Sequence, residues 1–437
     1  MRRLHALRSH AILALLALSG FIAPLAPAHA QQESVTYEEA IRLALERSPA
    51  NVAARGATRI AEADLMEVRG DWLPLVNANS SYANSSNERF DQSTGQLVSE
   101  SYAAQVSATY EVFTGGRRIA EWQAASASLR SAEASERGQR YTTILNTTRI
   151  FYQAAAAEEL LAAAHQRVQR ANRQQEFAET RRLIGTATRS DALRAELEES
   201  DAELAVLDAE SQLRTARLAL GRQIGRPGPV RPATAALPEE PPPIPPLEVL
   251  VRRAEENSPD ALAARAELDR AESEKMVAWT QYSPTLRLSG GYDWFSFTWP
   301  PNEESWSLRL TASLPLFTGF TREADVARAE AERRIAEAEA RDAVLLTRAR
   351  VEDAVGQIDT ATRRIDIARR ALAVAEEDLR VIEERYQLGA ATILDLQTSQ
   401  VALADAEVEW VRARQELGVA VVSLEAELGE PLVGIGG

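Results

Sequence analysis

The segment Ser305–Gly319, SWSLRLTASLPLFTG, alternates between apolar and polar side chains over most of its length. Its apolar positions are Trp306, Leu308, Leu310, Ala312, Leu314 and Leu316, and its polar positions are Ser305, Ser307, Arg309, Thr311 and Ser313. A period of two is typical of a β-strand with one apolar and one polar face. A tilted strand of about 9–11 residues can cross the hydrocarbon layer of a bilayer. The pattern therefore predicts a strand that can face lipid on one side.

An earlier segment, Ser101–Gly115, has the same arrangement. Both segments end in Phe-Thr-Gly and lead directly into long stretches without proline, which are expected to be helical. We expect the two strand-to-helix junctions to organise the chain, and their marker residues are Phe113, Gly115, Phe317 and Gly319.

The chain repeats itself with a nearly constant spacing. Ser48-Pro49 recurs 210 residues later as Ser258-Pro259, whereas Gly185 recurs 204 residues later as Gly389. The difference falls between the paired strands, at residues 85–100, which are rich in Ser, Asn, Asp and Gly. Because insertions are tolerated in surface loops, this segment is predicted to be a loop. The sequence thus predicts an internal duplication, in which one structural unit occurs twice along the chain.

Five regions follow from this repeat. Residues 1–30 have the layout of a signal peptide, with early arginines, an apolar core and Ala28-His29-Ala30 as the cleavage site. The chain contains no cysteine, so the mature N-terminus at Gln31 is expected to carry no lipid. The remaining regions are a first repeat at 31–225, a linker at 226–246 with nine of the 19 prolines, a second repeat at 247–430 and a tail at 431–437.

Each repeat is predicted to run helix, strand, strand, long helix, turn, helix. The expected helices span 38–72, 117–182 and 190–222 in the first repeat, and 247–282, 321–386 and 394–428 in the second. A leucine-rich heptad spacing in the last helix indicates coiled-coil packing, at Leu396, Leu403, Trp410, Leu417 and Leu424. The two shorter helices of a repeat, stacked end to end, match its long helix, which predicts a helical wall of constant height.

The four strands, of which the first in each repeat is expected near 75–84 and 285–294, are too few to form a closed barrel. Open strand edges are very costly in lipid, so copies of the chain are expected to share one barrel. Because an eight-stranded barrel is filled by its own side chains, three copies and twelve strands are favoured for a conducting barrel. The alternative is a soluble periplasmic coiled-coil scaffold or adaptor, in which the strands form a small sheet packed on a helix. The helices are charged on most faces, which leaves little surface to cover such a sheet.

Composition argues against several other functions. The net charge of −15 disfavours binding to nucleic acid. His165 is the one histidine that follows the predicted signal peptide, and the glutamate-rich stretches are solvated helix faces. With no cysteine, no phosphate-binding loop and no catalytic constellation, the chain is predicted to be neither an enzyme nor a holder of cofactors or metal ions.

Two motifs, Leu314–Gly319 (LPLFTG) and Arg385–Leu396 (RYQLGAATILDL), together with the duplicated layout, resemble the outer-membrane efflux protein family of TolC-like channels. The resemblance covers essentially the whole mature chain. It implies a homotrimer whose twelve-stranded barrel lies in the outer membrane of a Gram-negative bacterium and whose long helices form a periplasmic α-barrel. It also implies a periplasmic adaptor and an inner-membrane pump of RND or ABC type as partners. The implied function is a passive exit duct for tripartite efflux or type I secretion, with cargo and pump class left open.

The resemblance also assigns roles at the helix–helix turns of Gly185 and Gly389, which would lie at the periplasmic entrance. Asp191 and Asp395 match the acidic residues that ring the aperture, and Tyr386 matches a tyrosine that helps to hold it shut. Six carboxylates from three copies would favour the passage of cations over anions through the aperture. A second interpretation is that each aspartate only complements the dipole of the helix that it begins.

The sequence departs from the family pattern at two positions near this turn. Ala391 stands where the best-known member has a gating arginine, and Thr398 stands where it has a second aspartate. A single acidic ring and a weaker closure are therefore expected.

Overall fold

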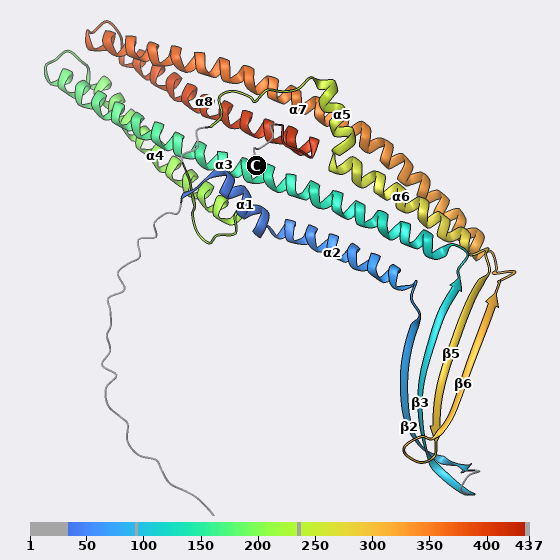
Figure 1. Cartoon of the computed structure of the whole chain (residues 1–437). Helices are drawn as coiled ribbons and strands as arrows, with labels where there is room; N and C mark the ends of the chain where they lie inside the picture. Colours follow the sequence, from blue (N-terminus) through green and yellow to red (C-terminus); the bar gives the residue numbers. More distant parts are fainter. Residues whose placement is uncertain (1–33, 92–94, 234–236, 433–437) are drawn as a thin grey trace, which may run out of the picture.

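The computed structural model describes residues 34–91, 95–233 and 237–432. It is elongated: a bundle of helices carries a four-stranded sheet at one end and two helical hairpin tips at the other (Figure 1). The predicted signal peptide, 1–30, and residues 433–437 of the predicted tail lie outside the described residues. No helix in the described ranges combines the length and the apolar character needed to span a membrane.

The elements of the two halves follow one another in the same order. The first half contains α1 (Tyr37–Arg47), α2 (Pro49–Gly70), β2 (Leu75–Asp91), β3 (Gln96–Phe113), α3 (Arg117–Leu183) and α4 (Arg189–Gln223). The second half contains α5 (Leu247–Asn257), α6 (Pro259–Thr280), β5 (Thr285–Ser296), β6 (Glu303–Ser313), α7 (Thr321–Gln387) and α8 (Ile393–Leu428). Both α3 and α7 have 67 residues, as the predicted pair of long helices requires.

The first predicted helix of each repeat is divided where the sequence has Ser-Pro. Ser48 ends α1, and Pro49 is the first residue of α2. Proline is tolerated at this position because its missing N–H group would have no partner within the helix. The same division separates α5 from α6 at Ser258.

The four long strands form one antiparallel sheet in the order β2-β3-β5-β6. The central β3–β5 pair joins the two halves, with Val106 opposite Tyr292. The outer strands β2 and β6 are therefore the open edges of the sheet (Figure 1). The predicted alternation leaves Leu308 and Leu310 of β6 largely exposed, which is unusual for large apolar side chains of a soluble sheet.

The strand ends differ from the prediction in two places. Residues 85–100 are not simply a loop, because β2 continues to Asp91 and β3 begins at Gln96. Backbone pairing resumes there at Arg89 and Val98 after a register shift, and such pairing does not require apolar side chains. At the other end, β6 stops at Ser313, short of Leu316, because Pro315 cannot donate a ladder hydrogen bond.

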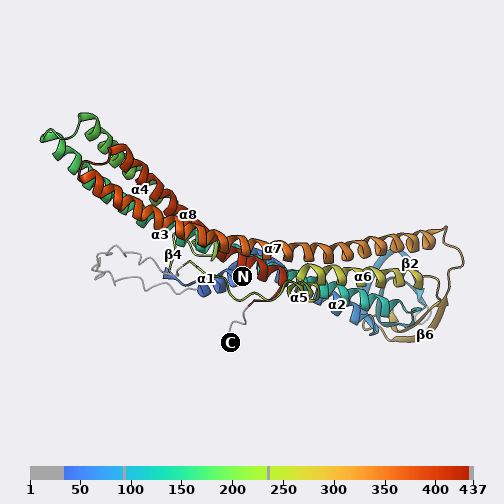
Figure 2. The same cartoon turned by 90° about the horizontal axis from the view of Figure 1, so that it is seen from above.

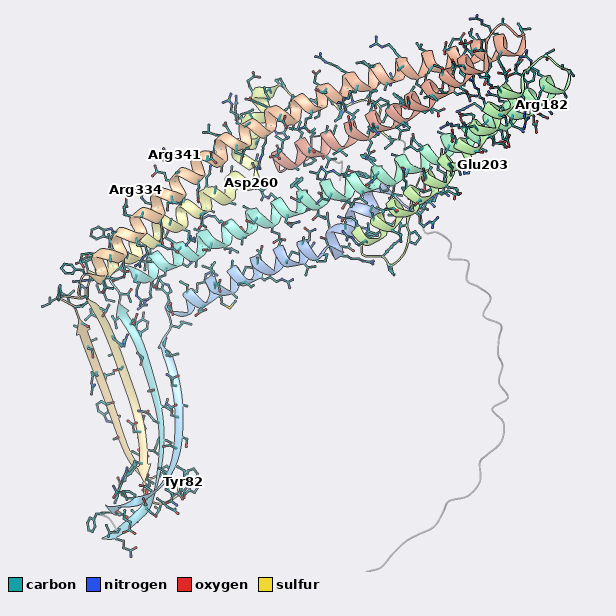
Figure 3. The ribbon with its side chains drawn as sticks, turned by 180° about the vertical axis from the view of Figure 1, so that it is seen from behind. Tyr82, Arg182, Glu203, Asp260, Arg334 and Arg341 are labelled. Atoms are coloured by element: carbon teal, nitrogen blue, oxygen red, sulfur yellow. The ribbon has the colours of Figure 1, made fainter. Side chains whose placement is uncertain are left out.

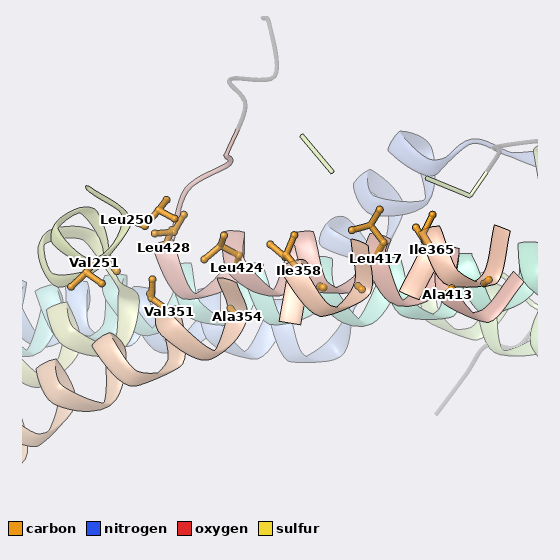
Figure 4. Close-up of a cluster of buried hydrophobic side chains, with 14 residues drawn as sticks. Leu250, Val251, Val351, Ala354, Ile358, Ile365, Ala413, Leu417, Leu424 and Leu428 are labelled. Atoms are coloured by element: carbon orange, nitrogen blue, oxygen red, sulfur yellow. The ribbon is translucent and has the colours of Figure 1, made fainter. Parts of the chain in front are cut away.

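The hydrophobic core is divided into separate clusters along the bundle. One cluster joins α5, α7 and α8 (Figure 4), and an equivalent cluster joins α1, α3 and α4. The leucines of the predicted heptad pattern in α8 are buried, namely Leu396, Leu403, Leu417 and Leu424. Alanines supply much of the remaining core, so neighbouring helices lie close together.

The segment between the halves packs on the bundle. It contains β4 (Arg231–Pro232), which pairs in parallel with β1 (Ser34–Val35), an interaction that the sequence did not suggest. Leu237 is fully buried, and its carbonyl oxygen accepts a hydrogen bond from Arg414 Nη2 at 3.0 Å. The proline-rich segment is thus held against α8.

Candidate functional site: the hairpin tips

Two helix–helix turns lie side by side at the end of the bundle farthest from the sheet (Figures 1 and 2). The first joins α3 to α4 and the second joins α7 to α8. Gly185 and Gly389 have φ angles of 81° and 78°, in the left-handed region that favours glycine. The left-handed backbone conformation thus explains why glycine occupies both predicted turn positions.

Asp191 and Asp395 each complete a capping box in the first turn of a helix. The backbone N–H and the hydroxyl group of Thr188 donate to Asp191 Oδ2 at 2.9 and 2.8 Å, and the Asp191 N–H donates to Thr188 Oγ1. Thr392 makes the same three contacts with Asp395. This geometry satisfies N–H groups that have no partner within the helix.

The caps also fix the charge of both aspartates. The hydrogen bond from the Thr188 backbone lowers the pKa of Asp191, and the bond from the Thr392 backbone lowers that of Asp395. Both side chains are therefore ionised at neutral pH. The capping role that the sequence offered as the second interpretation is present, and only Oδ2 of each carboxylate takes part in it.

Tyr386 lies inside the tip and is not exposed on its surface; it is only 5% exposed. Its ring packs edge-on against Phe177 of the other hairpin, with centroids 5.9 Å apart. Burial raises the pKa of the Tyr386 hydroxyl. Among the described residues this hydroxyl oxygen has no hydrogen-bond partner, so the side chain contributes packing and not a hydrogen bond within the protomer.

Arg181, which sequence reasoning missed, holds Tyr386 from the neighbouring hairpin. Its Nη1 donates to the Tyr386 carbonyl oxygen at 2.9 Å, and its guanidinium carbon lies 5.4 Å from the centre of the Tyr386 ring. Arg181 also donates to the carbonyl oxygen of Thr186 in its own turn. The contact joins residues 205 positions apart, and no local motif predicts it. The repeat did contain one signal for Arg181. Arg385 lies four residues before Gly389, just as Arg181 lies four residues before Gly185.

Polar side chains join the two hairpins behind this contact. Gln400 Nε2 donates to Gln174 Oε1 at 2.6 Å, and both residues are buried. Nearer the tip, Gln397 Nε2 of α8 donates to the carbonyl oxygen of Arg194 in α4. A small cleft of about 190 Å³ opens beside Tyr386. The structure therefore brings the two predicted aspartate-bearing turns together through these uncharged hydrogen bonds and the charged bond from Arg181.

The predicted junction residues lie between the sheet and the helices. Gly115 and Gly319 both have left-handed φ angles, of 64° and 62°. A Cβ atom on Gly115 would lie 2.2 Å from Ser283 Cβ, whereas one on Gly319 would meet nothing within 4 Å. Phe113 is about half exposed and Phe317 is more exposed. The first junction is thus covered by the second half, and the second junction is open.

Residues 34–91, 95–233 and 237–432 contain no group of three or more histidine, aspartate or glutamate side chains arranged to hold a metal ion. His165 lies within α3. The arrangement at the tips instead offers fixed negative charge at two helix starts and a set of contacts that hold two hairpins together.

Solved structures identify the fold as that of outer-membrane channels. The outer membrane protein VceC of Vibrio cholerae superimposes with a TM-score of 0.76 at 20% sequence identity, covering 91% of this chain and 97% of VceC. In sequence, a model of the outer membrane efflux protein family matches residues 40–226 and 250–430. The chain belongs to this family of outer-membrane channel proteins. The resemblance found in the sequence and the predicted outer-membrane location are confirmed.

Two curated proteins show related sequences. Protein CyaE of Bordetella pertussis is 27% identical over 324 residues, which cover 71% of this chain and 67% of CyaE. The cobalt-zinc-cadmium resistance protein CzcC of Cupriavidus metallidurans is 30% identical over 181 residues, which cover 40% of this chain and 42% of CzcC. Family membership favours a channel over the soluble scaffold or adaptor considered above, and no enzymatic activity is expected of it.

Proposed function

We propose that three copies of this chain form an outer-membrane duct with a shared twelve-stranded barrel and a periplasmic α-barrel. The observation that carries this proposal is the four-stranded sheet, which ends in two unpaired edge strands, β2 and β6. Unpaired backbone groups are very costly in lipid. Pairing β6 of one copy with β2 of the next removes every edge when the ring closes.

The contact between the two halves of the protomer indicates how copies would meet. Inside the chain, β3 pairs with β5, and α3 packs against α6 and α8. If the two halves are duplicates, with repeats at 31–225 and 247–430, the same relation places β6 and α7 of one copy against β2, α2 and α4 of the next. Such head-to-tail contacts generate a closed ring when the rotation fits.

The duct is passive in this proposal. The sequence contains no phosphate-binding loop, so energy for export comes from an inner-membrane pump of RND or ABC type, which a periplasmic adaptor connects to the hairpin tips. The system would serve efflux or type I secretion. Similarity to the cobalt-zinc-cadmium resistance protein CzcC supports an efflux role.

At the entrance, Asp191 and Asp395 would form an acidic ring around the aperture. We expect the double variant Asp191→Asn, Asp395→Asn to lower the preference for cations in planar-bilayer recordings, because six negative charges are lost while an acceptor oxygen remains for each cap. Since hydrogen bonds lower both pKa values, the ring keeps its charge as pH falls, and wild-type selectivity should decline only below the pH at which an ordinary aspartate side chain titrates. Unchanged cation selectivity in the double variant would contradict the proposed acidic ring.

Tyr386 would act as a closing residue through Arg181. Arg181→Ala removes a charged hydrogen bond and a cation–π contact, which are together worth about 2 kcal/mol or more. We expect the ratio of open to closed hairpins to rise at least about tenfold, visible as a larger mean conductance. Arg385→Ala is the matched control, because the Arg385 guanidinium donates to a carbonyl within its own turn. Equal effects of the two substitutions would argue against this role of Arg181.

A further inference from the structure

Charged residues of three neighbouring strands lie on one face of the sheet. In an antiparallel sheet, residues that stand opposite one another in neighbouring strands share a face. Glu111 of β3 stands opposite Arg287 of β5, and Ser289 of β5 stands opposite Arg309 of β6. Because alternate residues of a strand also share a face, Glu111, Arg287 and Arg309 project from the same side of the sheet.

The opposite face of the sheet is apolar and aromatic. It carries Leu308 and Leu310 of β6 and a contact between Tyr82 and Tyr102, whose ring centroids are 5.1 Å apart. Figure 3 shows Tyr82 near the end of the sheet that is farthest from the helices. In the proposed ring, on which this inference rests, the apolar face meets lipid and the charged face lines the interior.

The charged residues lie at the base of the sheet, where its strands join the helices. Glu111 accepts a hydrogen bond from Arg287 at 2.9 Å and one from Arg117, at the start of α3, at 2.6 Å. Arg117 also donates to Glu121 at 2.9 Å. We call these four residues, together with Arg309, the basal band. Its three guanidinium groups and two carboxylates leave one positive charge in each copy.

Arg309 is the member of the basal band that has no partner. Its side chain is exposed, and within the part of the chain that the structure describes it forms no hydrogen bond, ion pair or ring contact. Its neighbours on the same face are Ser289 opposite it and Ser307 and Thr311 along β6. The equivalent residue of β3, 204 positions earlier, is the uncharged Gln105. The free charge therefore belongs to the second half alone.

The next copy in the ring would not neutralise this charge. We expect β6 to pair with β2 of the next copy as β3 pairs with β5, where Gln105 stands opposite Asp293. The spacings of 204 and 210 residues then place Ala83 opposite Arg309. The residues two positions to either side of Ala83, which share its face, are both serines. Three unpaired guanidinium groups would thus line the interior.

Negative charge lies toward the other end of the same face. Asp293 and Glu303 are on the face of Arg309, closer to the end of the sheet that is farthest from the helices, which would be the mouth of the barrel. Neither carboxylate has a hydrogen bond or an ion pair among the residues that the structure describes. The charge of the interior therefore changes from positive at the base to negative at the mouth.

We propose that the basal band is a binding site for anionic groups on molecules that pass through the duct. A guanidinium group can contact a carboxylate, phosphate or sulfonate through two N–H groups at once. Rings of arginine favour anions in pores. Because water and salt screen exposed charges, the band holds multivalent anions weakly and releases them, as passage through a duct requires.

Block of the conductance by a multivalent anion tests the site in the full chain, in planar bilayers. The probe is pyrenetetrasulfonate, an organic anion with four negative charges, added on the side of the barrel mouth. Arg309→Gln keeps a polar side chain but removes three charges from the ring. It should raise the half-blocking concentration at least about tenfold at about 0.1 M salt. Arg309→Lys, the matched control, keeps the charge and should stay within about threefold of the wild type.

Two further measurements separate this site from the aperture and from contacts that do not depend on charge. The double variant Asp191→Asn, Asp395→Asn should keep the block, because these residues lie at the opposite end of the molecule from the sheet (Figure 1). Raising the salt to about 1 M should largely abolish the block of the wild type.

The other outcomes separate the site from the ring. A protein that neither assembles nor conducts would overturn the proposed ring and this site with it. A conducting trimer that is blocked equally in the wild type and in Arg309→Gln would overturn the basal band and leave the ring in place. Equal loss of the block in Arg309→Lys and Arg309→Gln, or a block that is indifferent to salt, would contradict attraction by charge.

Discussion

Replacing Leu308 and Leu310 with arginine is expected to abolish insertion of the protein into the outer membrane. Both side chains lie on one face of β6 and are largely exposed in the protomer. An arginine on the lipid face of a membrane strand costs about 2–4 kcal/mol at the bilayer midplane. The summed free-energy cost of two such substitutions in each of three copies would exceed the stability of most assemblies. The measurement is the amount of protein recovered in the detergent-extracted outer-membrane fraction.

The matched control uses the other face of the same strand. Ser307→Arg with Thr311→Arg adds the same charge at neighbouring positions that would face the water-filled interior. We expect this variant to insert normally. Equal loss of both variants would indicate that β6 is sensitive to bulk or charge and not to contact with lipid.

Gly115→Ala is expected to reduce folding severely, whereas Gly319→Ala is not. Both glycines have nearly the same left-handed φ angle. Placing alanine in this backbone conformation therefore costs about 1–2 kcal/mol of conformational free energy at either position. Only at Gly115 does the new Cβ meet another atom, Ser283 Cβ at 2.2 Å. Overpacking of this kind adds about 1–3 kcal/mol. The thermal midpoint and yield of the purified variants measure the difference.

The proposed ring adds a second expectation for Gly319. By the repeat, Leu73 stands where Ser283 does, so in the ring Gly319 of one copy would face Leu73 of the next. Gly319→Ala should therefore fold but assemble poorly. Normal assembly of this variant, or equal folding of the two alanine variants, would contradict the head-to-tail arrangement.

Much of the fold could be predicted because its causes are local and repeated. The alternation around Leu308 specifies a two-faced strand, Pro49 divides a helix, and the left-handed glycines 185 and 389 mark the turns. The second copy of each pattern corroborated the first. For this reason the predicted order of elements agrees with the structure in both halves.

The features that could not be predicted from the sequence depend on partners that are distant in sequence. The continuation of β2 to Asp91 depends on pairing with β3, and polar side chains gave no sign of it. Arg181 contacts Tyr386 across two hairpins, and β4 pairs with β1 from the opposite end of the first half. At Asp191 and Asp395 the sequence offered two roles; the structure supplies the capping contact, and the aperture role remains a proposal.

The central claim is that the two free edges of a four-stranded sheet are closed by identical copies. The most direct measurement is the mass of the detergent-solubilised, purified protein by native mass spectrometry, with bilayer conductance recorded on the same sample. The account predicts a particle of three chains that conducts ions. A single chain that remains dispersed in buffer without detergent would contradict it.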